Sequence, residues 1–366
     1  MHSQLAWKRN WDETKQHFLD WWQQDGLVIN TGDGFAAPEA HERIEAPGYE
    51  PEGYGDEAYC SDPDLRAQVE CYRLSRQQFP CDMMPLAGID LGPGTLSIYL
   101  GATPVFEGTV WYEPWMTDED PSEYGALRFD PAHRWWQITE ASAQASVALA
   151  RGKYIVGFPD LIENIDTLAA VRGTEAFLTD LCDRPAWVEQ KVAEINEAWF
   201  EVYQRLYDII KLEDDSSAFG AFSIWGPGKT AKLQSDASAM ISSGMFDRFV
   251  TPAITAQCEW LDHSMFHLDG SQCLCHVDSL LDIEALDAIE WTPDPGVPGG
   301  GDACWYDLYR RILDAGKSVQ AVGVKADQVL PLLEAVGGKG LYILRVTGIT
   351  DLADVEKLMR VVEPYR

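Results

Sequence analysis

The residues best suited by type and spacing to do chemistry are His267 and Asp269, in the segment His267-Leu268-Asp269-Gly270. They stand at the end of the apolar run Ser264–Leu268, which predicts a strand, and residues two apart on a strand face the same side. An imidazole and a carboxylate that converge can bind a divalent metal ion or act as an oriented acid–base pair. Gly270 allows a sharp turn after them. We therefore expect His267 and Asp269 to be catalytic or metal-binding; the plainer alternative is a hydrogen-bonded histidine at a polar strand end.

Strand-like and helical segments alternate along the chain and must position this pair. The predicted strands are Leu27–Asn30, Met84–Ile89, Tyr154–Phe158, Ala218–Trp225, Ser264–Leu268, Ala285–Trp291, Ser318–Gly323 and Leu341–Val346. The predicted helices include Pro185–Ile210, Met245–Leu261, Trp305–Ala315, Asp327–Val336 and Asp351–Val362. Such alternation indicates parallel strands joined by helical crossovers. The sequence therefore predicts an α/β fold, a (β/α)₈ TIM barrel over residues 1–366 as one domain, with residues 1–64 as an N-terminal helical elaboration.

An open, doubly wound sheet is the competing architecture. Its dinucleotide-binding form is disfavoured because no Gly-x-Gly-x-x-Gly follows an early strand. The segment Gly226-Pro227-Gly228-Lys229-Thr230 ends like a phosphate-binding loop, but Ser223 stands where the first glycine of that motif is required.

In a barrel of this type, reactive groups project from the carboxyl ends of the strands and from the loops that follow. That rule selects Asp160 and Trp225 as substrate-binding candidates. Gln234 and Asp236 follow a strand and could supply polar contacts to a substrate, although polar loop residues are often merely solvated. His276 begins a predicted short helix and would face the mouth, and Trp111 flanks a turn as an aromatic pocket wall. Of the nearby cysteines, Cys273 and Cys275 are expected to pack near the core, since Cys-x-Cys-His lacks the second half of a structural zinc site.

The charge balance restricts the partners. Lysine and arginine total 28 against 59 acidic residues, which gives a net charge of −31. This field repels nucleic acids and anionic membrane surfaces, and no apolar stretch is long enough to span a bilayer. The first residues lead into a charged pattern instead of an apolar signal core, and the 8 cysteines are expected to be free thiols. We expect a cytoplasmic protein.

The segment Gly220–Gly270 resembles the uroporphyrinogen decarboxylase superfamily. The likeness lies in Trp225-Gly226, in Met245-Phe246-Asp247-Arg248-Phe249-Val250-Thr251-Pro252 and in His267-Leu268-Asp269-Gly270, followed by His276–Ile283 and Ala288–Trp291. The glycine-rich stretch Asp90–Gly94 also fits, and the resemblance covers residues 65–362. It implies the same barrel fold.

The two branches of that superfamily differ in their motifs. The decarboxylases bind a tetrapyrrole through Arg-Gln-Ala-Gly-Arg, which this sequence lacks. The corrinoid-linked methyltransferases hold zinc through His-x-Cys and a distant cysteine. Here His267 matches, Asp269 replaces the cysteine, and no cysteine lies near Leu344–Thr347. The His-Leu-Asp-Gly form therefore looks like a separate subgroup, in which His267 and Asp269 could hold a divalent metal such as zinc through nitrogen and oxygen, or bind substrate directly.

The resemblance thus implies a methyltransferase that moves a methyl group between a small substrate and a corrinoid carried by a partner protein. Two alternatives stay open: a lyase or decarboxylase that acts on a small carboxylate, and a non-catalytic protein that binds a ligand or a corrinoid. The expected partners are a small-molecule substrate and a corrinoid protein, with a homodimer as a further option.

Overall fold

A parallel sheet of six strands is the main element of the computed structural model, which describes residues 4–52 and 55–366. Its spatial order is β1-β14-β13-β12-β11-β10. The strands are β1 (Leu27–Ile29), β10 (Thr230–Gln234), β11 (His263–Asp269), β12 (Ala288–Thr292), β13 (Ser318–Val322) and β14 (Leu341–Leu344). Nearly all their residues are buried, as expected for a parallel sheet covered on both faces.

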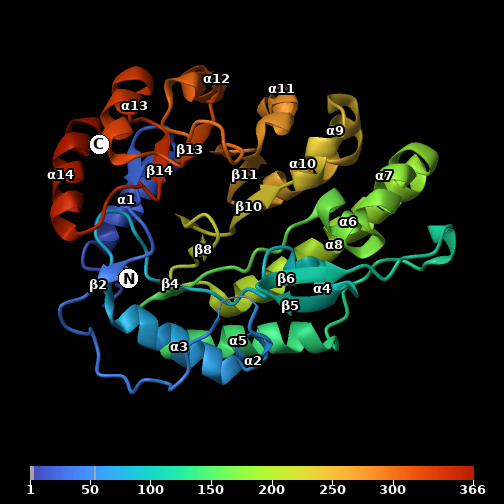
Figure 1. Cartoon of the computed structure of the whole chain (residues 1–366), viewed down its shortest axis with the longest axis horizontal. Coiled ribbons are helices and arrows are strands. Elements are labelled where there is room, and N and C mark those ends of the chain that lie inside the picture. Colours follow the sequence, from blue (N-terminus) through green and yellow to red (C-terminus); the bar gives the residue numbers. More distant parts are fainter. Residues whose placement is uncertain (1–3, 53–54) are drawn as a thin grey trace.

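Helices connect the successive strands and cover the outside of this sheet (Figure 1). They are α9 (Ser243–Phe249), α10 (Thr251–Trp260), α11 (Val277–Leu281), α12 (Tyr306–Asp314), α13 (Val329–Val336) and α14 (Leu352–Val362). Asp351 caps α14, since its side chain accepts a hydrogen bond from the Asp354 amide at 2.9 Å. The β-helix-β alternation predicted from the sequence is confirmed over this half of the chain.

Two further parallel strands, β4 (Leu86–Ala87) and β7 (Ile155–Val156), pair with each other and not with the six-stranded sheet. Asp82 links β1 to the segment before β4, because its amide donates to the Ile29 carbonyl and its carboxylate accepts from the Ile29 amide. The strand ladders of the described residues therefore do not close into the predicted eight-stranded barrel. The structure shows an α/β fold with a six-stranded parallel sheet and a separate parallel pair.

The prediction of a strand over Ala218–Trp225 is wrong. This segment is an antiparallel hairpin of β8 (Ser217–Phe219) and β9 (Ile224–Gly226), and the predicted set of eight missed the strand that follows, β10. The turn spans residues 220–223; it begins at Gly220, a turn signal inside the apolar run, and ends at Ser223, whose φ is 50°.

The hairpin stands between β7 and β10. Phe158 bridges Phe219 on one side, and the Ser217 hydroxyl bonds the Gly228 carbonyl on the other. Its tip reaches the strands opposite, since Gln320 of β13 donates to the Phe222 carbonyl and Tyr342 of β14 donates to the Ser223 carbonyl. The hairpin tip thus packs against β13 and β14.

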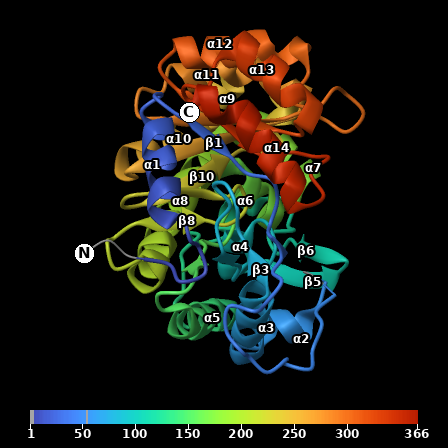
Figure 2. The ribbon, with the colours of Figure 1, turned by 90° about the vertical axis from the view of Figure 1, so that its left-hand side faces the viewer.

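In the first half of the chain, helices α2, α3 and α5 are grouped on the side of the molecule opposite α11–α13 (Figure 2), whereas α1 packs on the six-stranded sheet, with Trp21 donating to the Val319 carbonyl. The helices of this half are α1 (Trp11–Trp22), α2 (Glu57–Ser61), α3 (Pro63–Ser75), α4 (Thr95–Tyr99), α5 (Arg134–Ala150), α6 (Asn164–Arg172), α7 (Thr174–Asp183) and α8 (Pro185–Ile210). Its small sheets are β2 (Phe35–Ala36) with β3 (Gln77–Gln78), and β5 (Thr103–Glu107) with β6 (Thr109–Glu113).

Of two helices predicted from the sequence, one has the expected bounds and the other is divided into two. Helix α8 has the predicted bounds, but the single helix predicted over Met245–Leu261 is divided at Val250, because Pro252 lacks the amide hydrogen needed to continue a helix from α9. Among the described residues, no helix combines the length and the apolar character needed to cross a bilayer.

The contacts of the hairpin tip predict the effect of a conservative change. Tyr342→Phe removes the hydroxyl that donates to the buried Ser223 carbonyl at 3.0 Å. The free energy of unfolding should fall by about 1 kcal/mol, the cost of leaving a buried carbonyl without its partner. Denaturant unfolding measures this change, with Tyr72→Phe on the surface of α3 as the control. Equal stability of both variants would show that the tip is not held by this bond.

Candidate functional site

Three side chains that could ligate a metal ion lie together at the carboxyl ends of neighbouring strands. Asp236 follows β10, and His267 and Asp269 end β11, with one potential ligand atom of each within 4.8 Å of the others. Asp236 is exposed and the other two are half-buried, so a small ligand can reach the group from solvent. We call Asp236, His267 and Asp269 the carboxylate–histidine cluster.

Glu290 fixes the orientation of His267. The parallel register pairs the two residues across β11 and β12, and the Glu290 carboxylate contacts the imidazole Nδ1. Glu290 is fully buried and also accepts from the Thr292 hydroxyl at 2.6 Å. Burial alone would lower the pKa of His267, but the Glu290 charge outweighs burial and raises it. With Nδ1 held by Glu290, Nε2 is the ring nitrogen left to bind a ligand.

A buried polar chain connects the cluster to β7. Asp236 accepts from the Gln234 amide group at 2.8 Å, and the Gln234 side-chain oxygen contacts the Lys232 ammonium. Lys232, whose side chain is fully buried, forms an ion pair of 2.7 Å with Asp160. Asp160, Gln234 and Asp236, predicted separately, therefore belong to one hydrogen-bonded network.

The start of α6 fixes the backbone of this network. Glu163 accepts from the Gln234 amide at 2.6 Å, and Asp166 accepts from the Asp236 amide at 2.7 Å. On either side of Glu163, Ile162 and Asn164 have positive φ angles of 49° and 48°. Left-handed backbone at non-glycine residues costs free energy and is commonly retained where a functional geometry requires it.

Gly270 has the role predicted from the sequence. Its φ is 78°, and a Cβ atom there would lie 2.7 Å from an Asp294 carboxylate oxygen. The turn lets the Gly270 amide pair with the Thr292 carbonyl and brings the Ser271 amide onto Asp294 at 2.7 Å. Any side chain at this position would displace the chain directly after Asp269.

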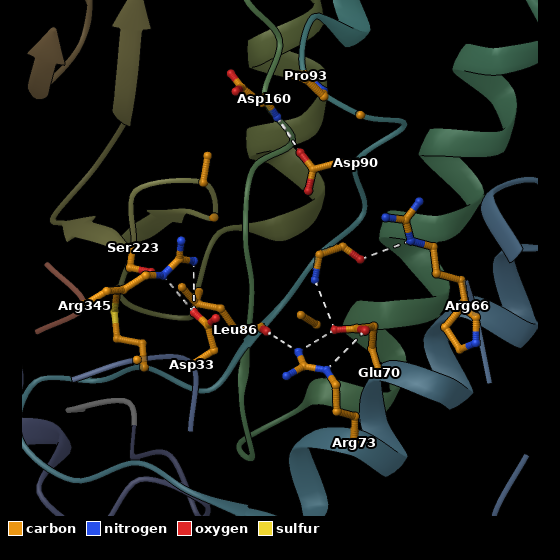
Figure 3. A pocket seen from close by; sticks show the side chains of 18 of the residues that line it. Asp33, Arg66, Glu70, Arg73, Leu86, Asp90, Pro93, Asp160, Ser223 and Arg345 are labelled. Atoms are coloured by element: carbon orange, nitrogen blue, oxygen red, sulfur yellow. Dashed lines mark hydrogen bonds and ion pairs between the residues drawn. The ribbon is translucent and has the colours of Figure 1, made fainter. Parts of the chain in front are cut away.

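A cavity of about 610 Å³ lies over the ends of β1, β4 and β7, beside the hairpin tip (Figure 3). Asp160 lines this cavity and, through Lys232, belongs to the network that reaches the cluster. Burial raises the pKa of Asp90, which also lines it, to about 6. The site thus has two parts, a small polar cluster and a larger cavity, joined by the Asp160–Lys232 pair.

The donor set of the cluster fits a divalent cation with nitrogen and oxygen ligands. One imidazole and two carboxylates are ligands that zinc, manganese or iron(II) accepts. It does not fit the cysteine-containing zinc set of the thiol methyltransferases. Cys273 is buried against Ser238, with Oγ and Sγ 3.5 Å apart, and neither it nor the exposed Cys275 belongs to the cluster.

Three residues predicted to bind substrate lie elsewhere. Trp111 is 63% exposed on β6, which forms a hairpin with β5. Trp225 is buried against Trp11 of α1, because the hairpin that replaces the predicted strand carries it there. His276 is buried, stacked on Phe246 and bonded to the Ser238 carbonyl, so it packs inside the fold where the sequence suggested that it faces the mouth.

The sequence reasoning missed Glu290 and Lys232 as site residues. Both are charged residues in the middle of apolar strand patterns, which is itself a signal, since lone charges are seldom buried without a partner. Glu290 lay inside the predicted strand Ala285–Trp291 but was not singled out, and Lys232 lay in the strand that was not recognised.

No protein-family model matches this chain, and no curated protein matches its sequence. Among solved structures it is similar to a methyltransferase from Methanosarcina mazei, with a TM-score of 0.61 over 96% of this chain and 98% of that one. The two sequences are 10% identical, so the likeness shows a shared fold.

The cluster predicts metal binding that depends on its own side chains. Titration calorimetry with zinc or manganese should give one site per chain in the unaltered protein and none in His267→Ala or Asp269→Ala, since each removes a ligand from a three-residue set. Asp247→Ala, which removes an exposed carboxylate from α9, should bind as the unaltered protein does. Undiminished binding in the cluster variants would rule out this site.

Glu290 should affect the affinity for the metal ion although it is not itself a ligand. Glu290→Gln keeps the shape of the side chain but removes the charge that holds the His267 Nδ1 proton. We expect metal affinity to fall by about 10- to 100-fold, the usual effect of losing the partner of a ligating histidine. Competition with a chromophoric chelator measures the affinity, and unchanged affinity would mean that His267 does not bind the metal through Nε2.

Proposed function

We propose that this protein is a methyltransferase that binds a divalent cation at Asp236, His267 and Asp269 and passes a methyl group between a small substrate and a corrinoid on a partner protein. The observation that carries the proposal is the carboxylate–histidine cluster at the carboxyl ends of β10 and β11, with Glu290 behind His267. The fold shared with the Methanosarcina mazei methyltransferase supports it, as does the sequence resemblance to the corrinoid-linked branch of the uroporphyrinogen decarboxylase superfamily.

In the proposed reaction, the bond between the methyl carbon and an oxygen or nitrogen of the substrate breaks. The electron pair of that bond stays on the oxygen or nitrogen, which leaves with an added negative charge or as a neutral amine. A divalent cation, when bound, supplies positive charge beside an oxygen that leaves. The methyl group would pass to a reduced corrinoid on the partner protein, whose electron pair would form the new bond to the methyl carbon.

The chain's own residues prepare this step. Asp236, His267 and Asp269 provide the ligands, and Glu290 keeps His267 in one tautomer. The buried Lys232 places a second positive charge beside the cluster, held by Asp160 and Gln234. Charges fixed before the reaction starts need no reorganisation when charge develops on the leaving atom.

Methyl transfer to the corrinoid can be followed by absorbance. Purified protein loaded with zinc or manganese, mixed with reduced cobalamin and a panel of small O- and N-methyl compounds, should convert the spectrum of the reduced form. His267→Ala should lower the rate by at least about 100-fold, because it removes both a ligand and the partner of Glu290. Asp247→Ala should react at the unaltered rate.

Two results would overturn the proposal. Release of carbon dioxide from small carboxylates without a corrinoid would favour a lyase. Ligand binding with no conversion that responds to His267→Ala or Asp269→Ala would favour a non-catalytic binding protein.

A further inference from the structure

The cavity over β1, β4 and β7 is lined by charges of both signs. Three arginines, Arg66, Arg73 and Arg345, face four acidic residues in its wall. The acidic residues are Asp33, Glu70, Asp90 and Asp160. The pairing of these charges therefore shows which of them is left to meet a ligand.

Most of these charges are already paired within the protein. Arg73 binds Glu70 through two nitrogens, the closer at 2.7 Å, and Arg345 binds Asp33 at 2.9 and 3.1 Å (Figure 3). Asp160 forms an ion pair with the ammonium group of Lys232. These pairs neutralise their own charges and leave Arg66 and Asp90 as the unpaired members of the wall.

Packing and one hydrogen bond hold the Arg66 side chain in place, but one of its guanidinium nitrogens has no hydrogen-bond partner. The residue is 2% exposed, the Tyr59 ring packs 5.3 Å from its guanidinium, and Nε donates to the Gly88 carbonyl at 3.2 Å. Its Nη1 is buried and has no hydrogen-bond partner, and no carboxylate of the described residues lies within 4.0 Å of its guanidinium. Asp90 acts on Arg66 only through space and forms no ion pair with it, so a bound anion would supply the contact that this buried guanidinium lacks.

Neither Glu70 nor Asp90 forms an ion pair with Arg66. Both oxygens of Glu70 are used, by Arg73, by the Tyr59 hydroxyl and by the Gly88 amide. Asp90 accepts from the Asp160 amide at 2.5 Å and forms no ion pair with Arg66. Figure 3 shows the same contrast, with a single dashed line from Arg66 and several from Arg73.

We propose that this cavity binds a small organic carboxylate, with the carboxylate on the guanidinium of Arg66. A carboxylate adds one negative charge beside Arg66 in a wall that also holds Asp90, whereas a phosphate dianion adds two and is repelled more strongly by Asp90. The inference names the substrate class of the proposed methyl transfer and rests on it only for the reaction, not for the binding. The methyl donor is then a carboxylate with a methyl group on oxygen or nitrogen.

The test is direct binding of named carboxylates without metal or corrinoid. Calorimetry at pH 7 and fixed ionic strength uses methoxyacetate, N,N-dimethylglycine and inorganic phosphate. We expect the two carboxylates to bind one per chain and phosphate not to compete. Arg66→Met should abolish binding, and Arg66→Lys, which keeps the charge but loses the forked donors, should weaken it about tenfold or more. Arg76→Met, which removes an exposed arginine just after α3, should bind normally.

Stability separates a binding role from a structural one. Arg66→Met removes a buried, unpaired charge and keeps much of the side-chain volume, so the unliganded variant should be at least as stable as the unaltered protein. Equal carboxylate affinity in Arg66→Met, absence of carboxylate binding in the unaltered protein, or binding of phosphate alone would each overturn the inference. A protein that binds these carboxylates through Arg66 but transfers no methyl group would keep the inference and overturn the proposed function.

Discussion

The parallel pairing of β10, β11 and β12 is the constraint on which the site depends. It aligns Gln234, His267 and Glu290 in one row across three strands. Parallel strands end on the same side of a sheet, so the residues just beyond that row, Asp236 and Asp269, come together without any long-range signal in the sequence. A shift of the register by one residue would turn each of these side chains to the other face and dissolve the cluster.

This arrangement buries charged side chains, and neighbouring residues supply a partner for most of them. Glu290 pairs with His267 and Lys232 with Asp160, while Glu163 and Asp166 accept hydrogen bonds from the backbone amides of Gln234 and Asp236. Burial raises the pKa of Glu163 to about 8, the largest cause being its removal from water. A network of this kind is costly when only partly satisfied, which makes the unpaired Arg66 stand out from its surroundings.

Sequence reasoning located the half of the fold with regular patterns and failed where the chain departs from them. The pair His267 and Asp269 could be found because a strand, a two-residue spacing and a glycine coincide. The hairpin at Ala218–Trp225 is predicted as one strand because its residues are mostly apolar, and Gly220 in the turn is the signal that could have divided it. Trp225 was assigned to a pocket for the same reason.

The missed site residues were hidden by a different effect. Lys232 and Glu290 sit in strands as charges, and only the three-dimensional partner explains why each is tolerated. His276 shows the reverse error, because a histidine at a helix start suggested a ligand contact while tertiary packing enclosed the ring against Phe246. Local spacing thus predicts which residues share a face, and packing decides which of them meet a ligand.

The proposed function depends most on the binding of a divalent cation by Asp236, His267 and Asp269 together. X-ray absorption at the zinc edge of the metal-loaded protein tests it most directly. We predict nitrogen and oxygen neighbours at about 2.0–2.2 Å with the outer scattering of one imidazole, and no sulfur at about 2.3 Å. A sulfur neighbour, or a spectrum without imidazole scattering, would contradict the account.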